Sequence, residues 1–241
     1  MKAFWDIHAH VLPGIDDGAK DWDMSLNMIQ KSFDAGVRHI IATPHYLPWQ
    51  KHNAAKKEIC LLCEEANRRI QKELGLDIEI LPGQEIYYHV DILKDLAEGK
   101  AQTLAGGKYV LVEFAENGAF SELISAAEKF RRSPFRVVAA HFERYEALRK
   151  QENLEQFLQT GVLLQSNIGE MKKGMFDSGK RFLQKAYAAG LVSFTASDMH
   201  NLSSRPPMAE ESLKWFRNRL DPAYMEELFC TNPAKLPGTT H

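Results

Sequence analysis

The sequence predicts an α/β protein in which one domain forms around parallel strands. Short segments rich in apolar, β-branched and aromatic residues alternate along the chain with amphipathic segments typical of helices. A helix after each strand makes successive strands parallel, because a parallel pair needs a long crossover connection. Roughly seven such units in 241 residues suit a distorted (β/α)7 TIM-like barrel formed by residues 1–241. A doubly wound open sheet is the alternative architecture.

The predicted strands share an apolar composition, and most end close to a proline, a glycine or an ionisable residue. Each is short enough to be a strand rather than a helix. In chain order they cover residues 4–7, 39–43, 78–81, 109–112, 136–140, 162–165 and 191–196.

The helices are predicted from apolar residues at helical spacing. The first begins at about Trp22 and buries Leu26, Ile29 and Phe33, and Gly36 suits its C-terminal cap. Two short amphipathic segments close the chain. The remaining helical patterns cover about residues 59–74, 90–97, 120–131, 154–158, 182–189, 213–216 and 225–229.

Charge and hydropathy exclude several classes of protein. Lysine and arginine number 30 against 32 for aspartate and glutamate, so the net charge is -2 and no basic excess favours nucleic acid or anionic lipid. No segment approaches membrane-spanning length, and the N-terminus lacks the apolar run of a signal peptide. We therefore expect a cytoplasmic protein that is not membrane-embedded and binds no nucleic acid.

A His-x-His pair stands at the end of the first predicted strand. Side chains two positions apart in extended backbone point to the same side, so His8 and His10 can converge on one metal ion. The same pair is compatible with ordinary structural histidines. Residues at the ends of the later strands favour the metal site.

Ionisable residues recur at or just past the C-terminal ends of the predicted strands. In a parallel barrel these ends share the face that carries the active site. Imidazole and carboxylate without thiolate suit manganese, iron, zinc or magnesium, and the large number of ligands suggests two or three divalent ions. The predicted metal ligands are His8, His10, His45, Glu85, Glu113, His141, Asp198 and His200.

Two arginines in loops on the same face favour a phosphate substrate. Arg144 follows His141, Arg205 follows His200, and guanidinium groups bind phosphate oxygens in pairs. A multi-metal cluster can generate hydroxide near neutral pH, which suits hydrolysis of phosphate esters or amides. Asp17 is a candidate general acid for the leaving oxygen, although Asp-Gly is also a common turn sequence.

The three cysteines do not indicate a disulfide framework. Cys60 and Cys63 form a C-x-x-C motif, but both belong to a helical pattern and are expected to pack there. Cys63 and Arg69 also have the C-x5-R spacing of cysteine-dependent tyrosine phosphatases. Their spacer, residues 64–68, contains no glycine and favours helix, whose N–H groups are already hydrogen-bonded. We therefore predict that Cys63 is not a nucleophile.

The ionisable residues belong to motifs spread over nearly the whole chain. These are Asp6-Ile7-His8-Ala9-His10, Asp16-Asp17-Gly18, Thr43-Pro44-His45, Gly83-Gln84-Glu85-Ile86-Tyr87-Tyr88, Glu113-Phe114, His141-Phe142-Glu143-Arg144-Tyr145 and residues 197–207. Together they resemble the polymerase-and-histidinol-phosphatase (PHP) superfamily. More narrowly, they resemble its bacterial protein-tyrosine phosphatases of capsule and exopolysaccharide biosynthesis.

The resemblance implies a distorted barrel, a trinuclear metal site that often holds manganese, and a partner tyrosine kinase with a phosphorylated tail. It also implies phosphate binding by Arg144 and Arg205 and acid catalysis by Asp17. Three alternatives remain. The substrate can instead be histidinol phosphate or another small phosphomonoester, or the protein can be a non-catalytic metal-binding regulator. A polymerase-associated nuclease is disfavoured by the lack of basic excess.

Overall fold

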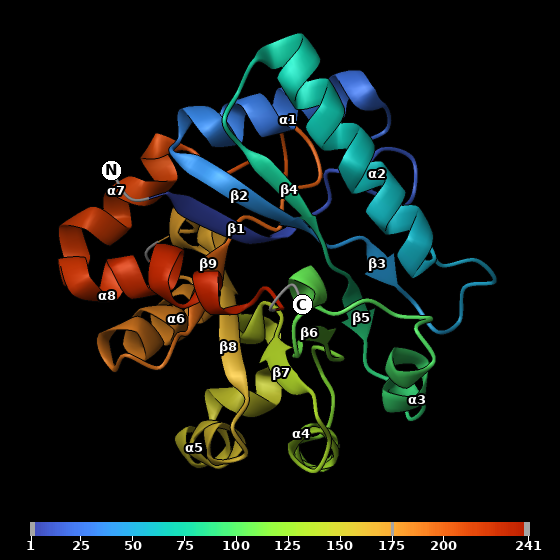
Figure 1. Cartoon of the computed structure of the whole chain (residues 1–241). Helices are drawn as coiled ribbons and strands as arrows, with labels where there is room; N and C mark the ends of the chain where they lie inside the picture. The colour runs from blue at the N-terminus through green and yellow to red at the C-terminus, as the bar shows by residue number, and fades with distance from the viewer. Residues whose placement is uncertain (1–2, 175, 239–241) are drawn as a thin grey trace.

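Every strand pair in the described chain is parallel, as the alternation of strands and helices predicted. The computed structural model describes residues 3–174 and 176–238 (Figure 1). One sheet has the strand order β1-β2-β4, and the other has the order β3-β5-β6-β7-β8-β9. The strands are β1 (Phe4–Ala9), β2 (Val37–Ala42), β3 (His45–Tyr46), β4 (Glu79–Pro82), β5 (Glu85–Tyr87), β6 (Tyr109–Glu113), β7 (Arg136–Ala139), β8 (Leu163–Asn167) and β9 (Phe194–Ala196).

Two of the predicted strands resume after the proline or glycine that interrupts them, and the sequence analysis missed this continuation. Pro44, which has no N–H to donate, separates β2 from β3, and Gly83 separates β4 from β5. A Cβ atom on Gly83 would lie 2.6 Å from Ile41, so this close approach requires glycine. The predicted ranges 39–43 and 78–81 were therefore incomplete. His45 and Glu85 pair with each other in β3 and β5 and do not lie in loops.

Together the two sheets curl until the last strand, β9, lies beside the first strand, β1. Ala9 and Met199 form a parallel bridge. The Asp198 N–H donates to the His8 carbonyl at 2.9 Å, and the His10 N–H donates to the Met199 carbonyl at 2.9 Å. These bonds join the end of β9 to the end of β1, so the alternative of a doubly wound open sheet was wrong. The predicted α/β class with a curled parallel sheet is confirmed.

Helices α1, α2, α4, α5 and α6 lie outside the curled sheet (Figure 1). The predicted start of α1 is confirmed, because Asp21 caps it by accepting a hydrogen bond from the Met24 N–H at 2.8 Å. No helix in the described part of the chain is long and apolar enough to cross a membrane. The helices are α1 (Trp22–Asp34), α2 (Lys56–Arg69), α3 (Ile92–Ala97), α4 (Phe120–Arg131), α5 (Gln151–Gln159), α6 (Ser178–Ala188), α7 (Glu210–Arg219) and α8 (Pro222–Glu226).

The apolar core has two parts, one on each side of the sheet. The larger part lies between the strands and the surrounding helices. The smaller part fills the interior with side chains such as Trp5, Leu111 and Phe194, and Leu236 from the end of the chain packs into it. The interior is therefore apolar toward the N-terminal strand ends. The ionisable side chains predicted as metal ligands lie at the opposite end.

Candidate metal centre

The interior side of the strands changes from apolar to ionisable toward the C-terminal strand ends. On β6, Leu111 and Glu113 share one side because strand side chains alternate. Leu111 packs in the interior core, and Glu113 ends the strand. On β9, Ala196 packs in the same core and Asp198 follows two residues later. The predicted ligands thus lie at the C-terminal face, as expected for a parallel barrel.

A bulge in β1 aims the two predicted histidine ligands into this end of the interior. Between Asp6 and Ala9, β1 carries one more residue than the paired segment of β2. Such an insertion shifts the alternation by one position. Ile7 therefore packs in the interior core while His8 and His10 also face the interior. Both imidazoles are buried, and their Nε2 atoms lie 3.2 Å apart, so the predicted convergence is confirmed.

Two other predicted ligands have a left-handed backbone conformation. The φ angle is 33° at His141 and 53° at Asp198, values that cost a non-glycine residue about 1–3 kcal/mol. Hydrogen bonds from neighbouring strands hold both residues in place. The His141 N–H donates to Gln165 Oε1 at 3.0 Å, and the Asp198 N–H donates to the His8 carbonyl. The sharp turn after each strand places both side chains at the centre rather than continuing the strand direction.

The loop after β1 folds back onto His10. The Ala19 N–H donates to the His10 carbonyl at 3.1 Å, and the Gly18 N–H donates to Asp16 Oδ1 at 2.9 Å. A Cβ atom on Gly18 would lie 2.2 Å from the His10 carbonyl oxygen, so only glycine fits here. This turn places Asp16 against His10 and leaves Asp17 exposed at the mouth of the centre, with a side chain 62% accessible.

Glu85 is the point on which the histidines converge. Its Oε2 atom lies 3.0 Å from His45 Nδ1, 3.2 Å from His8 Nε2 and 3.4 Å from His10 Nε2. Its Oε1 atom accepts a hydrogen bond from His141 Nε2 at 2.9 Å. Glu85 is 1% exposed, so this carboxylate is held entirely by the surrounding side chains.

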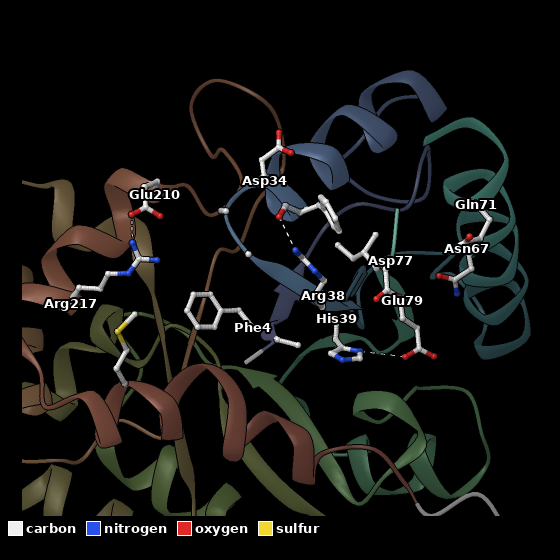
Figure 2. Close-up of a pocket in the computed structure, with 16 residues that line it drawn as sticks. Phe4, Asp34, Arg38, His39, Asn67, Gln71, Asp77, Glu79, Glu210 and Arg217 are labelled. Carbon is white, nitrogen blue, oxygen red and sulfur yellow. Dashed lines mark hydrogen bonds and ion pairs between the residues drawn. The ribbon is translucent and has the colours of Figure 1, made fainter. Parts of the chain in front are cut away.

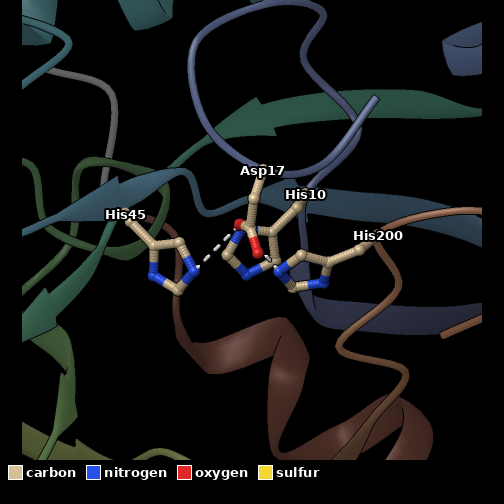
Figure 3. A group of neighbouring side chains, drawn as sticks. All are labelled: His10, Asp17, His45 and His200. Atoms are coloured by element: carbon tan, nitrogen blue, oxygen red, sulfur yellow. Dashed lines mark ion pairs between the residues drawn. The ribbon is translucent and has the colours of Figure 1, made fainter. Parts of the chain in front are cut away.

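The remaining predicted ligands complete the cluster. Asp198 Oδ1 lies 3.4 Å from His8 Nε2 and 3.5 Å from His200 Nδ1. Glu113 Oε1 lies 3.6 Å from His141 Nε2. Three groups have possible ligand atoms within 4.8 Å of one another, and His141 belongs to none of them. The groups are His10, Asp17, His45 and His200 (Figure 3); His8, His10 and Asp198; and His45, Glu85 and Glu113.

The donor set fits divalent metal ions. Several buried ligand atoms have no hydrogen-bond partner among the described residues, including Glu85 Oε2 and His200 Nε2. A buried polar atom without a partner is costly, and a carboxylate oxygen facing several imidazole nitrogens is how metal ligands are arranged. Imidazole and carboxylate are ligands for zinc, manganese and iron, and no thiolate is present in the three groups.

The electrostatics of the centre also fit cation binding. Burial lowers the pKa of His10, but the hydrogen bond to Asp16 and the contact with Glu85 outweigh it and raise that pKa to about 10. Burial raises the pKa of Glu85, but His8, His10 and the other histidines hold it well below its ordinary value. Positive charge on His8 and His10, whose pKa values are both raised, thus compensates the buried carboxylates. A metal ion would replace those protons.

Metal affinity should rise with pH. The His10 Nδ1–H donates to Asp16 Oδ2 at 2.7 Å, so the proton that a metal ion displaces is the one on Nε2. With a pKa of about 10, His10 is protonated at neutral pH, and each displaced proton makes affinity about tenfold higher per pH unit. We expect Mn²⁺ affinity to increase from pH 6 to pH 8. Calorimetry in buffers of different ionisation enthalpy will detect the released protons. An affinity that does not change with pH would contradict this.

Sequence analysis missed the side chains that position the ligands, most of them on β8. The His8 Nδ1–H donates to Gln165 Oε1 at 3.0 Å, and Gln165 Nε2 donates to Asn167 Oδ1 at 2.9 Å. Asn167 Nδ2 then donates to Asp198 Oδ2 at 2.7 Å. Asp16 plays the same role for His10. One signal in the sequence could have identified the residues on β8. They are polar residues at the C-terminal end of a predicted strand to which no metal ligand was assigned.

The two predicted phosphate-binding arginines reach the same edge of the cluster. Arg144 Nη2 lies 3.4 Å from Asp198 Oδ2, and Arg205 Nη2 lies 3.1 Å from Asp198 Oδ1. Arg205 Nη1 also lies 3.5 Å from Asp17 Oδ2. Asp17 Oδ1 is 3.3 Å from both His45 Nε2 and His200 Nε2. The structure therefore gathers every predicted site residue, and it places Asp17 among possible ligands as well as near the arginines.

A cavity of about 1260 Å³ lies at the other end of the strands and has a different character (Figure 2). Several of its charged side chains are engaged with one another or with backbone. His39 Nδ1 lies 3.4 Å from Glu79, Arg217 pairs with Glu210, and Arg38 donates to the Phe33 carbonyl at 2.9 Å. None of the predicted site residues lines this cavity. The chemistry lies at the C-terminal face, although the cavity there is smaller.

Cys63 lies outside the centre, as the helical pattern predicted. It is a buried residue of α2, on the outer side of the sheet (Figure 1). Burial raises the pKa of its thiol, and Cys60 and Glu64 raise it further. The Arg69 guanidinium pairs with Glu65 at 2.6 Å and lies over the Trp22 ring. The C-x5-R motif therefore offers phosphate neither a thiolate at Cys63 nor a free guanidinium at Arg69.

Replacing Cys63 should leave catalysis intact. If the protein is the tyrosine phosphatase that the resemblance implies, we expect Cys63→Ser to hydrolyse phosphotyrosine at close to the rate of the parent protein, because Cys63 belongs to none of the possible ligand groups. Cys63→Ala separates the loss of the thiol from the cost of burying a hydroxyl. The measurement is turnover at matched metal content, with circular dichroism to verify folding. A folded, metal-loaded Cys63→Ser protein without activity would contradict the metal-dependent mechanism.

The fold and the site together define a metal-binding α/β protein of the TIM-like class. A phosphotriesterase homology protein from Escherichia coli shares this fold, with a TM-score of 0.57 at 12% identity over 98% of each chain. That likeness shows the fold alone.

The chain belongs to the family described as capsular polysaccharide synthesis, CpsB/CapC, which matches residues 4–237. Tyrosine-protein phosphatase CpsB of Streptococcus agalactiae serotype V is 32% identical over 236 residues, covering 94% of this chain and 95% of the relative. Tyrosine-protein phosphatase YwqE of Bacillus subtilis is 33% identical over 216 residues, covering 86% of this chain and 82% of the relative.

A solved structure gives the same result. It is described as YwqE from Bacillus subtilis and CpsB from Streptococcus pneumoniae, unique metal-dependent tyrosine phosphatases. It matches with a TM-score of 0.84 at 28% identity, covering 96% of this chain and 93% of the other. The resemblance to the PHP-type tyrosine phosphatases of capsule synthesis is thereby confirmed.

Proposed function

We propose that this protein is a metal-dependent protein-tyrosine phosphatase, a phosphoric monoester hydrolase. The observation that carries the proposal is the convergence of buried imidazole and carboxylate groups with Arg144 and Arg205 at one end of the sheet. The CpsB/CapC family, in which relatives are named tyrosine-protein phosphatases, supports the same substrate.

The proposed cofactor is two or three divalent ions, with manganese as the first choice and iron, zinc or magnesium as alternatives. Bound ions of this kind act as Lewis acids toward phosphate and lower the pKa of water. Gln165, Asn167 and Asp16 orient the ligands through the hydrogen bonds described above. The proposed ligands are His8, His10, His45, Glu85, Glu113, His141, Asp198 and His200.

Arg144 and Arg205 are proposed to bind the phosphate oxygens. Both guanidinium groups contact the buried Asp198 and are themselves partly exposed, so they lie between the cluster and solvent. Paired N–H donors suit two oxygens of one phosphate. Asp17, exposed at the mouth and 3.5 Å from Arg205, is proposed to donate a proton to the leaving phenol oxygen.

We further propose that residues 1–241 form one phosphatase domain with a distorted (β/α)7 barrel. In that description β2 with β3, and β4 with β5, each count as one interrupted strand. The proposed physiological substrate is a bacterial tyrosine kinase of polysaccharide assembly, because the family is described by capsular polysaccharide synthesis. A cytoplasmic location remains a prediction of the sequence.

One assay compares the candidate functions. Metal-loaded protein is incubated with a phosphotyrosyl peptide, a phosphoseryl peptide, histidinol phosphate and p-nitrophenyl phosphate, and released phosphate is measured. Preference for the phosphotyrosyl peptide supports the proposal. Preference for histidinol phosphate would replace it with the small-molecule alternative. No hydrolysis of any ester at verified metal content would favour the non-catalytic regulator.

A further inference from the structure

A second cavity opens directly beside the candidate metal centre. It has a volume of about 360 Å³ and lies between the segments that follow β8 and β9. Asp198, Arg144 and Arg205 line it on the side of the centre. Lys172 and Lys173, at the end of the short helix after β8, line it farther away. A protein substrate whose phosphate contacts the two arginines therefore has this cavity next to the phosphorylated residue.

The cavity carries an excess of positive charge. Four basic side chains and two acidic ones line it. Of the acidic groups, Asp198 faces the histidines and both arginines. Glu170 pairs with Lys173 at 2.7 Å. Lys172 is exposed and forms no ion pair with any residue that the structure describes. Lys172 is therefore available to an anionic group in addition to the phosphate that the two arginines are proposed to bind.

One wall of the cavity is held in shape by its own hydrogen bonds. Asn201 Oδ1 accepts the N–H groups of Ser203 at 2.9 Å, Ser204 at 2.8 Å and Arg205 at 3.1 Å. The two prolines at residues 206–207 continue this wall and restrict its backbone. A wall that is already ordered loses little entropy when a ligand binds. This wall of the cavity is thus already formed before a ligand binds.

Resting on the proposed function, we infer that this cavity binds a carboxylate side chain of the protein substrate beside the phosphorylated tyrosine. Lys172 recognises the carboxylate, and Arg144 and Arg205 hold the phosphate. The positive charge of the cavity complements a carboxylate, and the cavity shares Arg144, Arg205 and Asp198 with the centre. The substrate class is therefore an acidic phosphotyrosyl segment rather than a neutral one. Lys172 is a specificity residue and does not contact the reacting atoms.

The test measures binding separately from hydrolysis. Two peptides carry a non-hydrolysable phosphonate analogue of phosphotyrosine, flanked on both sides by glutamate in one and by glutamine in the other. Binding to the full manganese-loaded chain is measured by fluorescence polarisation. We expect a two- to fivefold preference, as about one solvent-exposed ion pair provides, for the glutamate peptide. Raising the salt concentration should reduce the preference, because exposed charges are screened.

Lys172→Glu should abolish or reverse that preference while leaving p-nitrophenyl phosphate turnover unchanged. The matched control is Lys185→Glu, the same charge change at an exposed position in the last turn of α6, outside this cavity. A preference that survives Lys172→Glu, or is absent from the parent protein, overturns the inference. So does equal weakening of both peptides. Failure of the proposed function can be told apart from failure of this inference. It would appear as no hydrolysis of any phosphate ester, whichever peptide binds more tightly.

Discussion

Strong chelation is expected to abolish the phosphatase activity, and added Mn²⁺ is expected to restore it. Without metal ions the buried carboxylates of the centre contact only protein side chains, and nothing there activates water. The measurement is turnover of a phosphotyrosyl peptide alongside elemental analysis of the same sample. Full activity in a verified metal-free preparation would rule out the metal-dependent mechanism.

Variants of two ligands extend this prediction. Asp198→Asn and His141→Asn should lower the metal content and reduce turnover toward background. Asparagine is the suitable replacement, because both positions have positive φ and asparagine tolerates that conformation. His39→Asn is the matched control. His39 stacks on Trp5 at the opposite end of the strands and should retain both metal and activity. Loss of activity with unchanged metal content in all three variants would contradict the assignment.

The second large effect concerns phosphate binding. Arg144→Ala and Arg205→Ala should each reduce kcat/KM for phosphotyrosyl peptides by about tenfold to a hundredfold. The estimate is the loss of one charge-assisted hydrogen-bonded contact, about 1.5–3 kcal/mol. Both guanidinium groups also contact Asp198, so metal content must be measured for each variant. We expect it to be unchanged.

Two controls separate phosphate binding from general effects of charge. Arg219→Ala removes an exposed guanidinium in the last turn of α7, which belongs neither to the possible ligand groups nor to the lining of the cavity beside them, and should leave turnover unaltered. Arg144→Lys keeps the charge but loses the paired donors, and should recover only part of the activity. If Arg144→Ala and Arg205→Ala hydrolyse phosphotyrosine as fast as the parent protein, both residues are surface charges and the phosphate assignment is wrong.

The order of strands and helices was predictable because it depends on the pattern of residues within short segments of the sequence. Apolar residues at spacing of two or 3.6 identify strands and helices wherever they occur. The predicted helix at residues 120–131 coincides with α4, and the start of α1 at Trp22 is confirmed. Errors occurred at boundaries that depend on strand pairing. The strand predicted over residues 191–196 is paired only from Phe194, and β8 continues to Asn167.

The candidate ligands were predictable for a related reason. Parallel strands bring their C-terminal ends to one face, so ionisable residues after successive strands must become neighbours. His8 and His10 needed only the alternation of side chains along a strand to be placed together. The motifs around Asp17 and Arg205 added the resemblance to a family. The gathering of all these residues at one end of the sheet followed from fold class alone.

Other features depend on contacts between segments far apart in the sequence. The bulge in β1 becomes visible only when β1 pairs with β2, and it decides that Ile7 and His8 both face the interior. Nothing local marks Gln165 as the partner of His8, because 157 residues separate them.

The sequence by itself determined the α/β class, the order of its elements and the set of ionisable residues at the strand ends. These are properties of short segments and of topology. Tertiary structure alone decided the left-handed turns at His141 and Asp198, the curling of β9 against β1, and the hydrogen bonds that orient each imidazole. The physical reason is that local strain and ring orientation are fixed by distant neighbours, whose positions exist only after the curled sheet has brought β9 beside β1.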